Sequence, residues 1–157
     1  RGPSGAGSHG YGADGGSRMI ILDTSVLSEV FRPHPDTRVT VWLESLADDV
    51  AITAITLAEL LAGVRRLPNG RRRETLSTAV STTVQTYRST RAILAFDSSA
   101  AEHYATILAA REHAGLPISM ADAQIAAICR AHGASCATRD TKDFAQTGIE
   151  LINPWHE

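Results

Sequence analysis

Five short apolar segments alternate with longer helical patterns along this chain of 157 residues, and this alternation constrains the fold more than any other feature. Each segment has the length of a buried strand. They are MIILD (19–23), DVAIT (49–53), AILAF (92–96), ASCAT (134–138) and IELIN (149–153). Parallel strands need crossover connections, which helices usually supply. The pattern therefore predicts an α/β protein, a three-layer α/β/α sandwich with a mostly parallel central sheet.

Helical periodicity fills the intervals between the predicted strands. We expect a first helix that Pro33 ends, and a last one closed by His132-Gly133 as a glycine C-cap. The expected ranges are about 26–32, 39–46, 57–66, 71–88, 99–114 and 121–131.

The first eighteen residues differ in composition from the rest. They hold seven of the twelve glycines and a GSH triplet, so we interpret residues 1–18 as a disordered expression tag or linker and residues 19–157 as one domain. The net charge of -2 excludes a uniformly basic nucleic-acid coat. No apolar run approaches the roughly 18 residues of a membrane span. Cys129 and Cys136 match no metal spacing and suit reduced thiols, so we expect a soluble cytoplasmic protein.

Four acidic residues fall where ligands bind in such sheets, beyond the carboxyl ends of the strands. Asp23 directly continues the first strand, and Asp140 follows the ASCAT strand. Glu59 and Asp122 each lie early in a predicted helix. The predicted topology therefore brings four carboxylates toward one edge of the sheet.

Each acid also has a structural interpretation. Asp23 can cap the first helix. Thr56-Leu57-Ala58-Glu59 and Ser119-Met120-Ala121-Asp122 fit or resemble a capping box, and so does Ser99-Ala100-Ala101-Glu102, where nothing suggests chemistry. A single box therefore proves nothing, and the convergence of four acids carries the functional interpretation.

Carboxylates brought close together repel one another, and a hard divalent cation removes that penalty. Mg²⁺ prefers oxygen ligands and is typically held by one or two carboxylates together with water and substrate phosphate. An acidic pocket without histidine or cysteine therefore indicates Mg²⁺ or Mn²⁺ and phosphate chemistry rather than zinc.

These residues resemble a known family, the PIN-domain ribonucleases, and in particular the VapC-type toxins of type II toxin–antitoxin pairs and their FitB-like subgroup. The resemblance extends from Met19 to Trp155. It is carried by five segments in order: ILDTSVLSE, AITLAELLAGV around Glu59, ISMADAQIAAI around Asp122, ATRDTKDF around Asp140, and the closing INPW.

The resemblance implies a PIN-like fold and a Mg²⁺-dependent endoribonuclease that hydrolyses RNA with a metal-activated water. It implies catalytic roles for Asp23, Glu59, Asp122 and Asp140, with Asp23 and Asp122 as the metal ligands, for one ion or two. Either Asp140 or Asp143 completes the acidic site. Thr24 and Thr138 occupy positions where hydroxyls of the family support the site, and Ser119 is a helix cap.

A basic turn, RRLPNGRRR (65–73), gathers Arg65, Arg66, Arg71, Arg72 and Arg73. It favours contact with an RNA backbone, or a solvated helical hairpin, or, by the resemblance, contact with a partner. The resemblance also implies a cognate antitoxin, a homodimer or a hetero-oligomer with that antitoxin, and operator DNA only through the antitoxin. The RNA target is not encoded in any motif.

Two other functions compete with the nuclease. One is a non-catalytic or weakly catalytic module that binds an antitoxin within a DNA-binding repressor complex. The other is a haloacid-dehalogenase-like phosphatase, which also begins with an acid after its first strand. That family resembles DxDx[TV], and here Asp23 is followed by Thr24 and Ser25 with no second acid.

Overall fold

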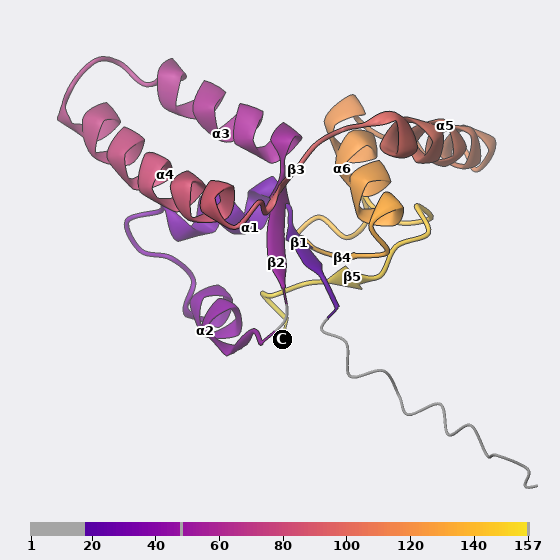
Figure 1. Ribbon diagram of the computed structural model, residues 1–157, viewed down its shortest axis with the longest axis horizontal. Coiled ribbons are helices and arrows are strands. Elements are labelled where there is room, and N and C mark those ends of the chain that lie inside the picture. Colours follow the sequence, from indigo (N-terminus) through magenta and orange to yellow (C-terminus); the bar gives the residue numbers. More distant parts are fainter. Residues whose placement is uncertain (1–17, 48, 157) are drawn as a thin grey trace, which may run out of the picture.

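The computed structural model describes residues 18–47 and 49–156 and consists of five strands and six helices within them (Figure 1). The strands are β1 (Ile20–Leu22), β2 (Val50–Thr53), β3 (Ile93–Leu94), β4 (Ser135–Ala137) and β5 (Leu151–Ile152). The helices are α1 (Thr24–Val30), α2 (Thr37–Ser45), α3 (Ala54–Arg66), α4 (Arg71–Ser89), α5 (Ser98–His113) and α6 (Met120–Ala131). The interpretation of residues 1–18 as a tag falls outside the described residues apart from Arg18, and so does the last residue of the predicted domain.

The described strands form one sheet in the order β3-β2-β1-β4-β5, and every neighbouring pair is parallel. In β1, Ile21 pairs with Ala51 of β2 on one side and with Cys136 of β4 on the other. All five predicted strands are therefore confirmed. The α/β prediction is confirmed too, in the form of an all-parallel sheet.

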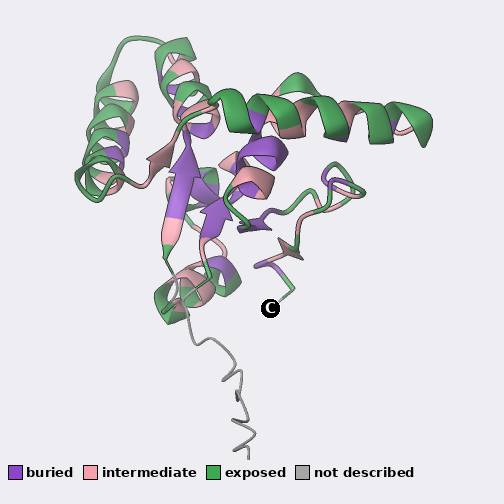
Figure 2. Ribbon diagram, turned by 45° about the vertical axis from the view of Figure 1, so that its right-hand side comes forward, coloured by how far each residue is buried: buried purple, intermediate pink, exposed green. Residues whose placement is uncertain are grey.

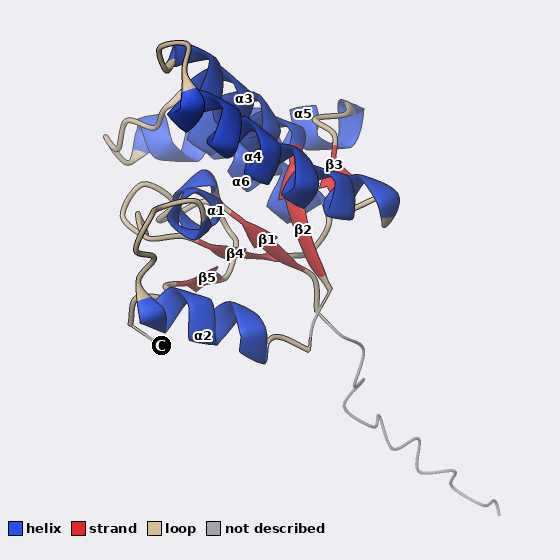
Figure 3. Cartoon of the chain, turned by 90° about the vertical axis from the view of Figure 1, so that its left-hand side faces the viewer, coloured by secondary structure: helices blue, strands red, loops and turns tan. Residues whose placement is uncertain are grey.

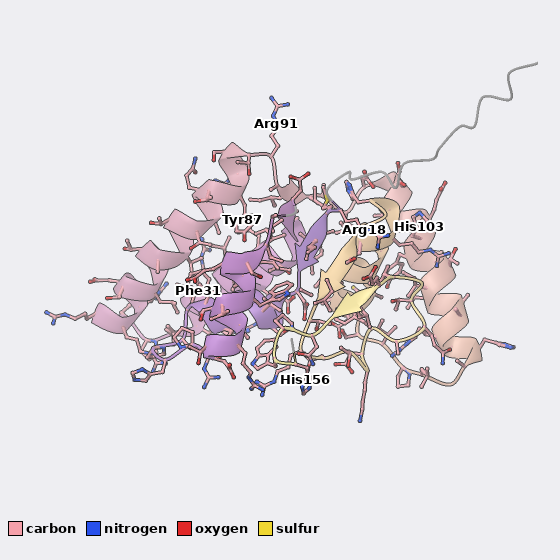
Figure 4. All side chains as sticks on the ribbon, turned by 90° about the horizontal axis from the view of Figure 1, so that it is seen from below. Arg18, Phe31, Tyr87, Arg91, His103 and His156 are labelled. Atoms are coloured by element: carbon pink, nitrogen blue, oxygen red, sulfur yellow. The ribbon has the colours of Figure 1, made fainter. Side chains whose placement is uncertain are left out.

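Helices cover both faces of the sheet because successive strand residues point to opposite faces. Ile20 and Leu22 pack into the core beneath α1, α2, α3 and α4, whereas Ile21 packs into the core beneath α5 and α6. Figure 2 shows that the central strands are buried, and Figure 3 shows the helices around the sheet. In Figure 4, Phe31 and Tyr87 lie on the α4 side and His103 lies on α5. The predicted three-layer sandwich is confirmed.

The strand order places a switch point beside β1. From β1 the chain passes to β2 on one side, and after β3 it returns to β4 on the other side. The connections at the carboxyl ends of β1 and β4 consequently diverge, and ligands of open parallel sheets bind at such a crevice. Asp23 and Thr138 are the first residues after these two strands.

The predicted start of α3 was wrong by three residues, whereas the predicted start of α5 is confirmed to within one residue. The helix α3 begins at Ala54 rather than about residue 57, because the Thr53 hydroxyl caps it by accepting from the Thr56 amide at 3.1 Å. The helix α5 begins at Ser98, because Asp97 caps it by accepting from the Ala100 amide at 2.9 Å. The caps sit at the ends of the preceding segments, so neither Thr56 nor Ser99 opens a capping box.

The predicted end of α6 is confirmed. His132 is the C-cap, and Gly133 follows with φ +60, a left-handed conformation that glycine adopts without steric cost. Among the described residues, no helix has the length and apolar character needed to cross a membrane.

Adjacent leucines on α3 test the assignment of the core. Leu60 is 8% exposed and packs beneath α3, whereas Leu61 is 42% exposed. Leu60→Ala should lower the free energy of unfolding by about 2–5 kcal/mol, because it removes buried methyl groups and leaves a cavity. The matched substitution Leu61→Ala should cost less than about 1 kcal/mol. Urea denaturation measures both, and equal losses would contradict the assigned face of α3.

Candidate functional site

Asp23 occupies the N-cap position of α1, but its side chain does not cap the helix. The residue is only 5% exposed, and its Oδ2 accepts hydrogen bonds from the hydroxyls of Ser25 and Thr138, each at 2.9 Å. Among the described residues, none donates to Oδ1, and no buried side-chain oxygen lacks a partner. Oδ1 therefore has no hydrogen-bond donor among the described residues and is not fully buried. The capping interpretation of Asp23 is wrong for the side chain, although the position is that of a cap.

The two hydroxyls that hold Asp23 are themselves fixed by backbone amides. The Ser25 hydroxyl accepts from the Arg139 amide at 3.2 Å, and the Thr138 hydroxyl accepts from the Asp140 amide at 3.0 Å. A hydroxyl that accepts from an amide is left to donate its one proton to the carboxylate. The end of β1, the start of α1 and the segment after β4 therefore share one hydrogen-bond network.

Glu59 lies on α3, and its carboxylate Oε1 accepts from the Thr24 hydroxyl at 2.9 Å. The Thr24 oxygen is also 3.0 Å from the Thr56 oxygen. Because a carboxylate only accepts, Thr24 donates to Glu59 and accepts from Thr56. The capping-box interpretation of Glu59 is wrong, since α3 begins before Thr56. Thr24 and Glu59 are instead held together across two helices.

Asp122 lies in the first turn of α6, which Ser119 caps by accepting from the Asp122 amide at 3.1 Å. The predicted cap is confirmed here. Burial raises the pKa of Asp122 to about 6, a hydrogen bond with Ser119 opposes this rise, and the charges of Asp23, Asp143 and Glu59 add to it. The negative charges of three other segments therefore all act on the Asp122 carboxylate.

Asp140 and Asp143 belong to the irregular segment between β4 and β5 and are both exposed. Burial raises the pKa of Asp140, the charges of Asp23 and Asp143 raise it further, and Arg139 lowers it. Asp140 thus interacts with Asp23, whereas Asp143 interacts with both Asp122 and Asp140. We call the edge of the sheet near Asp23, Glu59, Asp122, Asp140 and Asp143 the acidic edge. Either Asp140 or Asp143 can complete the site there.

Trp155 contacts the segment after β4 through Arg139. Trp155 is buried, and the Arg139 guanidinium lies 5.0 Å from the centre of its ring, which is a cation–π contact. The Trp155 amide donates to Asn153 Oδ1 at 3.0 Å, so the INPW sequence forms a turn that presents the ring. Trp155 is therefore a packing residue beside the acidic edge.

Comparison with known proteins agrees with this geometry. The PIN domain family model matches residues 20–150. The toxin FitB of Neisseria gonorrhoeae is 41% identical over 140 residues, which cover 88% of this chain and 100% of FitB. The chain belongs to the PIN-domain family. The VapC ribonuclease Y4jK of Sinorhizobium fredii is 38% identical over 138 residues, 87% of this chain and 98% of that protein.

Solved structures support the same relationship. A chain in the crystal structure of FitAcB from Neisseria gonorrhoeae superposes on this PIN domain with a TM-score of 0.82 at 41% identity, over 88% of this chain and 100% of that chain. A chain in the structure of FitAB bound to an IR36 DNA fragment superposes with a TM-score of 0.83 at 40% identity, over 88% and 97% of the two chains. The predicted resemblance to the VapC and FitB proteins is confirmed, and the phosphatase alternative is set aside.

The donor set of this PIN domain fits a hard divalent cation. The acids that interact electrostatically provide only oxygen ligands, and the repulsion among them is what a cation relieves. Within residues 18–47 and 49–156, no group of three or more His, Cys, Asp or Glu side chains is preassembled to hold a metal ion. Mg²⁺ typically keeps several waters and uses one or two carboxylates together with substrate phosphate.

A cleft of about 530 Å³ connects Glu59 with the basic turn. Its lining comes from the end of α1, from α3 and from α4, and it includes Glu59, Phe31 and Arg72. Arg65 and Arg66 lie in the last turn of α3, where the helix dipole favours cations, and Arg71, Arg72 and Arg73 open α4. Only Arg72 of the five lines this cleft, so the basic turn borders the acidic site through that residue.

Two contributors to the site were not predicted from the sequence. Ser25 has a detectable signal, a hydroxyl two residues after an acid at the end of a strand, but its bond to Asp23 depends on the position of the segment after β4. Arg111 is a charged residue at a core position of α5, four residues after the buried Ile107, and two of its four partners, Lys142 and Ala145, are distant in the sequence. Neither contact is visible in local spacing alone.

The raised pKa of Asp122 makes stability depend on pH. An acid whose pKa is about 6 when folded and 3.8 when unfolded binds more protons in the folded state between these values, so its ionisation lowers stability as pH rises through this window. In EDTA at pH 7, Asp122→Asn should exceed the wild type in free energy of unfolding by about 1 kcal/mol, a value reduced for partial solvent exposure. This gap should narrow toward pH 4. Urea denaturation across this range measures it.

Glu102→Gln is the control for this measurement, because Glu102 is an exposed acid on α5. The same urea series on Glu102→Gln gives the baseline for replacing one carboxylate by an amide away from Asp122. A gap between Asp122→Asn and the wild type that is the same at pH 4 and pH 7 would contradict the assigned environment of Asp122.

Proposed function

We propose that this protein is a cytoplasmic, Mg²⁺- or Mn²⁺-dependent endoribonuclease and the toxin of a type II toxin–antitoxin pair. The observation that carries the proposal is the Asp23 carboxylate, which is buried at the carboxyl end of the central strand. It does not cap α1, and its Oδ1 has no hydrogen-bond donor among the described residues. A purely structural cap would bond the amides of α1 instead. Family membership and the similarity to a VapC ribonuclease support the same activity.

Each acid has a proposed role that follows from its surroundings. Asp23 and Asp122 bind the cation, since no described residue donates to Asp23 Oδ1 and Asp122 interacts with the other acids of the site. Glu59, held by the Thr24 hydroxyl, orients the attacking water or a second ion. Thr138 holds Asp23 and the Asp140 amide at once, so it positions rather than reacts. Asp140 or Asp143 completes the acidic site.

A bound divalent cation would lower the pKa of the attacking water and offset the negative charge that grows on the phosphate during hydrolysis. The protein itself supplies the rigidity of the site. The hydroxyls of Ser25 and Thr138 fix the orientation of the Asp23 carboxylate, and the cap at Ser119 fixes the first turn of α6. By the resemblance, the products carry 5′-phosphate and 3′-hydroxyl ends.

The substrate approaches along the basic turn in this proposal. Arg72 and Glu59 line the same cleft, so a phosphate backbone lying against Arg72 is close to the acidic residues. Arg65, Arg66, Arg71 and Arg73 extend the positive surface on the flanks of this turn. Neutralisation of phosphates by such residues gives affinity without sequence preference, so the choice of RNA depends on other contacts.

A cognate antitoxin is the proposed protein partner. It would cover the apolar part of the cleft, which Phe31, Leu67 and Leu76 line, and thereby deny RNA access to Glu59. The similarity to a chain of the FitAB complex bound to DNA supports an assembly of toxin and antitoxin in which the antitoxin binds operator DNA. A homodimer or a hetero-oligomer with the antitoxin is the assembly expected by this similarity.

Metal-dependent cleavage of RNA tests the proposal. The purified protein should cleave RNA with Mg²⁺ or Mn²⁺ and lose this activity in excess EDTA. Asp23→Asn and Asp122→Asn should each lower the cleavage rate by more than about 100-fold, since loss of a ligand should exceed the effect of losing a supporting residue. The measurement is the initial rate on a labelled RNA, with cleavage ends mapped by sequencing.

Glu102→Gln again serves as the matched control, because it makes the same change from carboxylate to amide on α5 without touching the acidic edge. It should cleave like the wild type. Cleavage that survives both aspartate substitutions or excess EDTA would contradict the mechanism. Folded protein that cleaves no RNA under any of these conditions would favour the non-catalytic antitoxin-binding module instead.

A further inference from the structure

Arg111 is a cation inside the protein. It lies in the last turn of α5 and is 3% exposed. An arginine side chain remains charged in proteins, and burying a charge is costly unless hydrogen bonds compensate it. Burial at this position therefore needs an explanation from the partners of the guanidinium.

Every hydrogen bond of the guanidinium goes to a main-chain carbonyl. Nε donates to Leu116 at 3.1 Å, and Nη2 donates to Pro117 at 2.8 Å. Nη1 donates to Ala145 at 2.7 Å and to Lys142 at 3.4 Å. The planar fork of arginine suits this arrangement, because its donors point in fixed directions. The side chain thus ties together two chain segments that are about thirty residues apart in the sequence.

Both segments lead to the acidic edge. Leu116 and Pro117 lie three and two residues before the Ser119 cap, which sets the first turn of α6 and hence the position of Asp122. Lys142 and Ala145 lie on either side of Asp143, in the segment that also carries Asp140. Arg111 therefore binds one pair of carbonyls in the segment that leads to Asp122 and another pair in the segment that carries Asp140 and Asp143.

The second segment has little structure of its own to hold it. Residues 141–147 form only turns, such as the bond from the Asp143 amide to the Asp140 carbonyl at 3.0 Å. Its other anchor is Phe144, which is buried in the core beneath α5 and α6. Beside Phe144, the hydrogen bonds from Arg111 to the Lys142 and Ala145 carbonyls therefore hold this segment in place.

We propose that Arg111 is a positioning residue of the acidic site, which holds the segment leading into Asp122 against the segment carrying Asp140 and Asp143. The inference rests on the proposed cation site for its functional consequence, whereas the connection itself rests on the four hydrogen bonds. Arg111 touches neither substrate nor cation. It acts by keeping the carboxylates at the separation at which one cation can engage them.

Amide hydrogen exchange and Mn²⁺ titration of Arg111→Lys and Arg111→Met test the proposal. A lysine ammonium is a compact charge that cannot reach all four carbonyls, so both variants should exchange faster, by about tenfold or more, in residues 114–119 and 139–147. The dissociation constant for Mn²⁺ should rise about 10- to 100-fold. In the wild type, Mn²⁺ should slow exchange in both segments together.

Ile107→Ala is the matched control, because Ile107 is buried one turn earlier on α5 and its aliphatic side chain forms no hydrogen bonds. This variant should lower global stability and leave the affinity for Mn²⁺ unchanged. It should also leave unchanged the exchange contrast, which is the difference in amide exchange rate between the two segments and the sheet. Arg111 variants that behave like this control, with uniform exchange and unchanged Mn²⁺ affinity, would overturn the positioning role. If Arg111→Met does not fold, Arg111→Lys and the wild-type measurement decide. A wild type that binds no Mn²⁺ would contradict the proposed function, and the exchange contrast alone would then decide whether Arg111 connects the segments.

Discussion

The acidic edge depends on how one carboxylate is held. Asp23 ends the central strand of the sheet, and the hydroxyls of Ser25 and Thr138 both donate to its Oδ2. Each of these hydroxyls accepts in turn from a backbone amide of the segment after β4. Oδ2 of Asp23 therefore connects two neighbouring strand ends at the switch point, whereas Oδ1 accepts no hydrogen bond from the described residues. The Asp23 side chain forms no capping hydrogen bond with α1.

The fold then has to tolerate acids that repel one another. Asp122 interacts with the charges of Asp23, Asp143 and Glu59, which arrive from β1, the segment after β4, and α3. Three contacts hold these segments: the hydrogen bond from the Thr24 hydroxyl to Glu59, the Ser119 cap before Asp122, and the hydrogen bonds of Arg111 to the segment that carries Asp143. In the proposed function, the carboxylates held in this way share a cation with a phosphate of the substrate.

Local patterns in the sequence predict the layers of the fold, because strand and helix periodicities are properties of short segments. Five strands and the parallel sheet follow from that periodicity and from the topology it allows, and so does the placement of Asp23 and Asp140 after neighbouring strands. The start of α3 was less predictable, since Thr53 caps it from the preceding segment. The hydrogen bonds from Thr138 to Asp23 and from Arg111 to Ala145 could not be predicted, because they join residues that only tertiary structure brings together.

The most direct test of this account is a crystal structure of the protein soaked with Mn²⁺, in which anomalous scattering locates the ion. The account predicts an anomalous peak within bonding distance, roughly 2.0–2.3 Å, of Asp23 Oδ1 and an Asp122 oxygen, with Asp23 Oδ2 still bonded to Ser25 and Thr138. A peak elsewhere on the protein, or a fully occupied site that Asp23 does not contact, would contradict it.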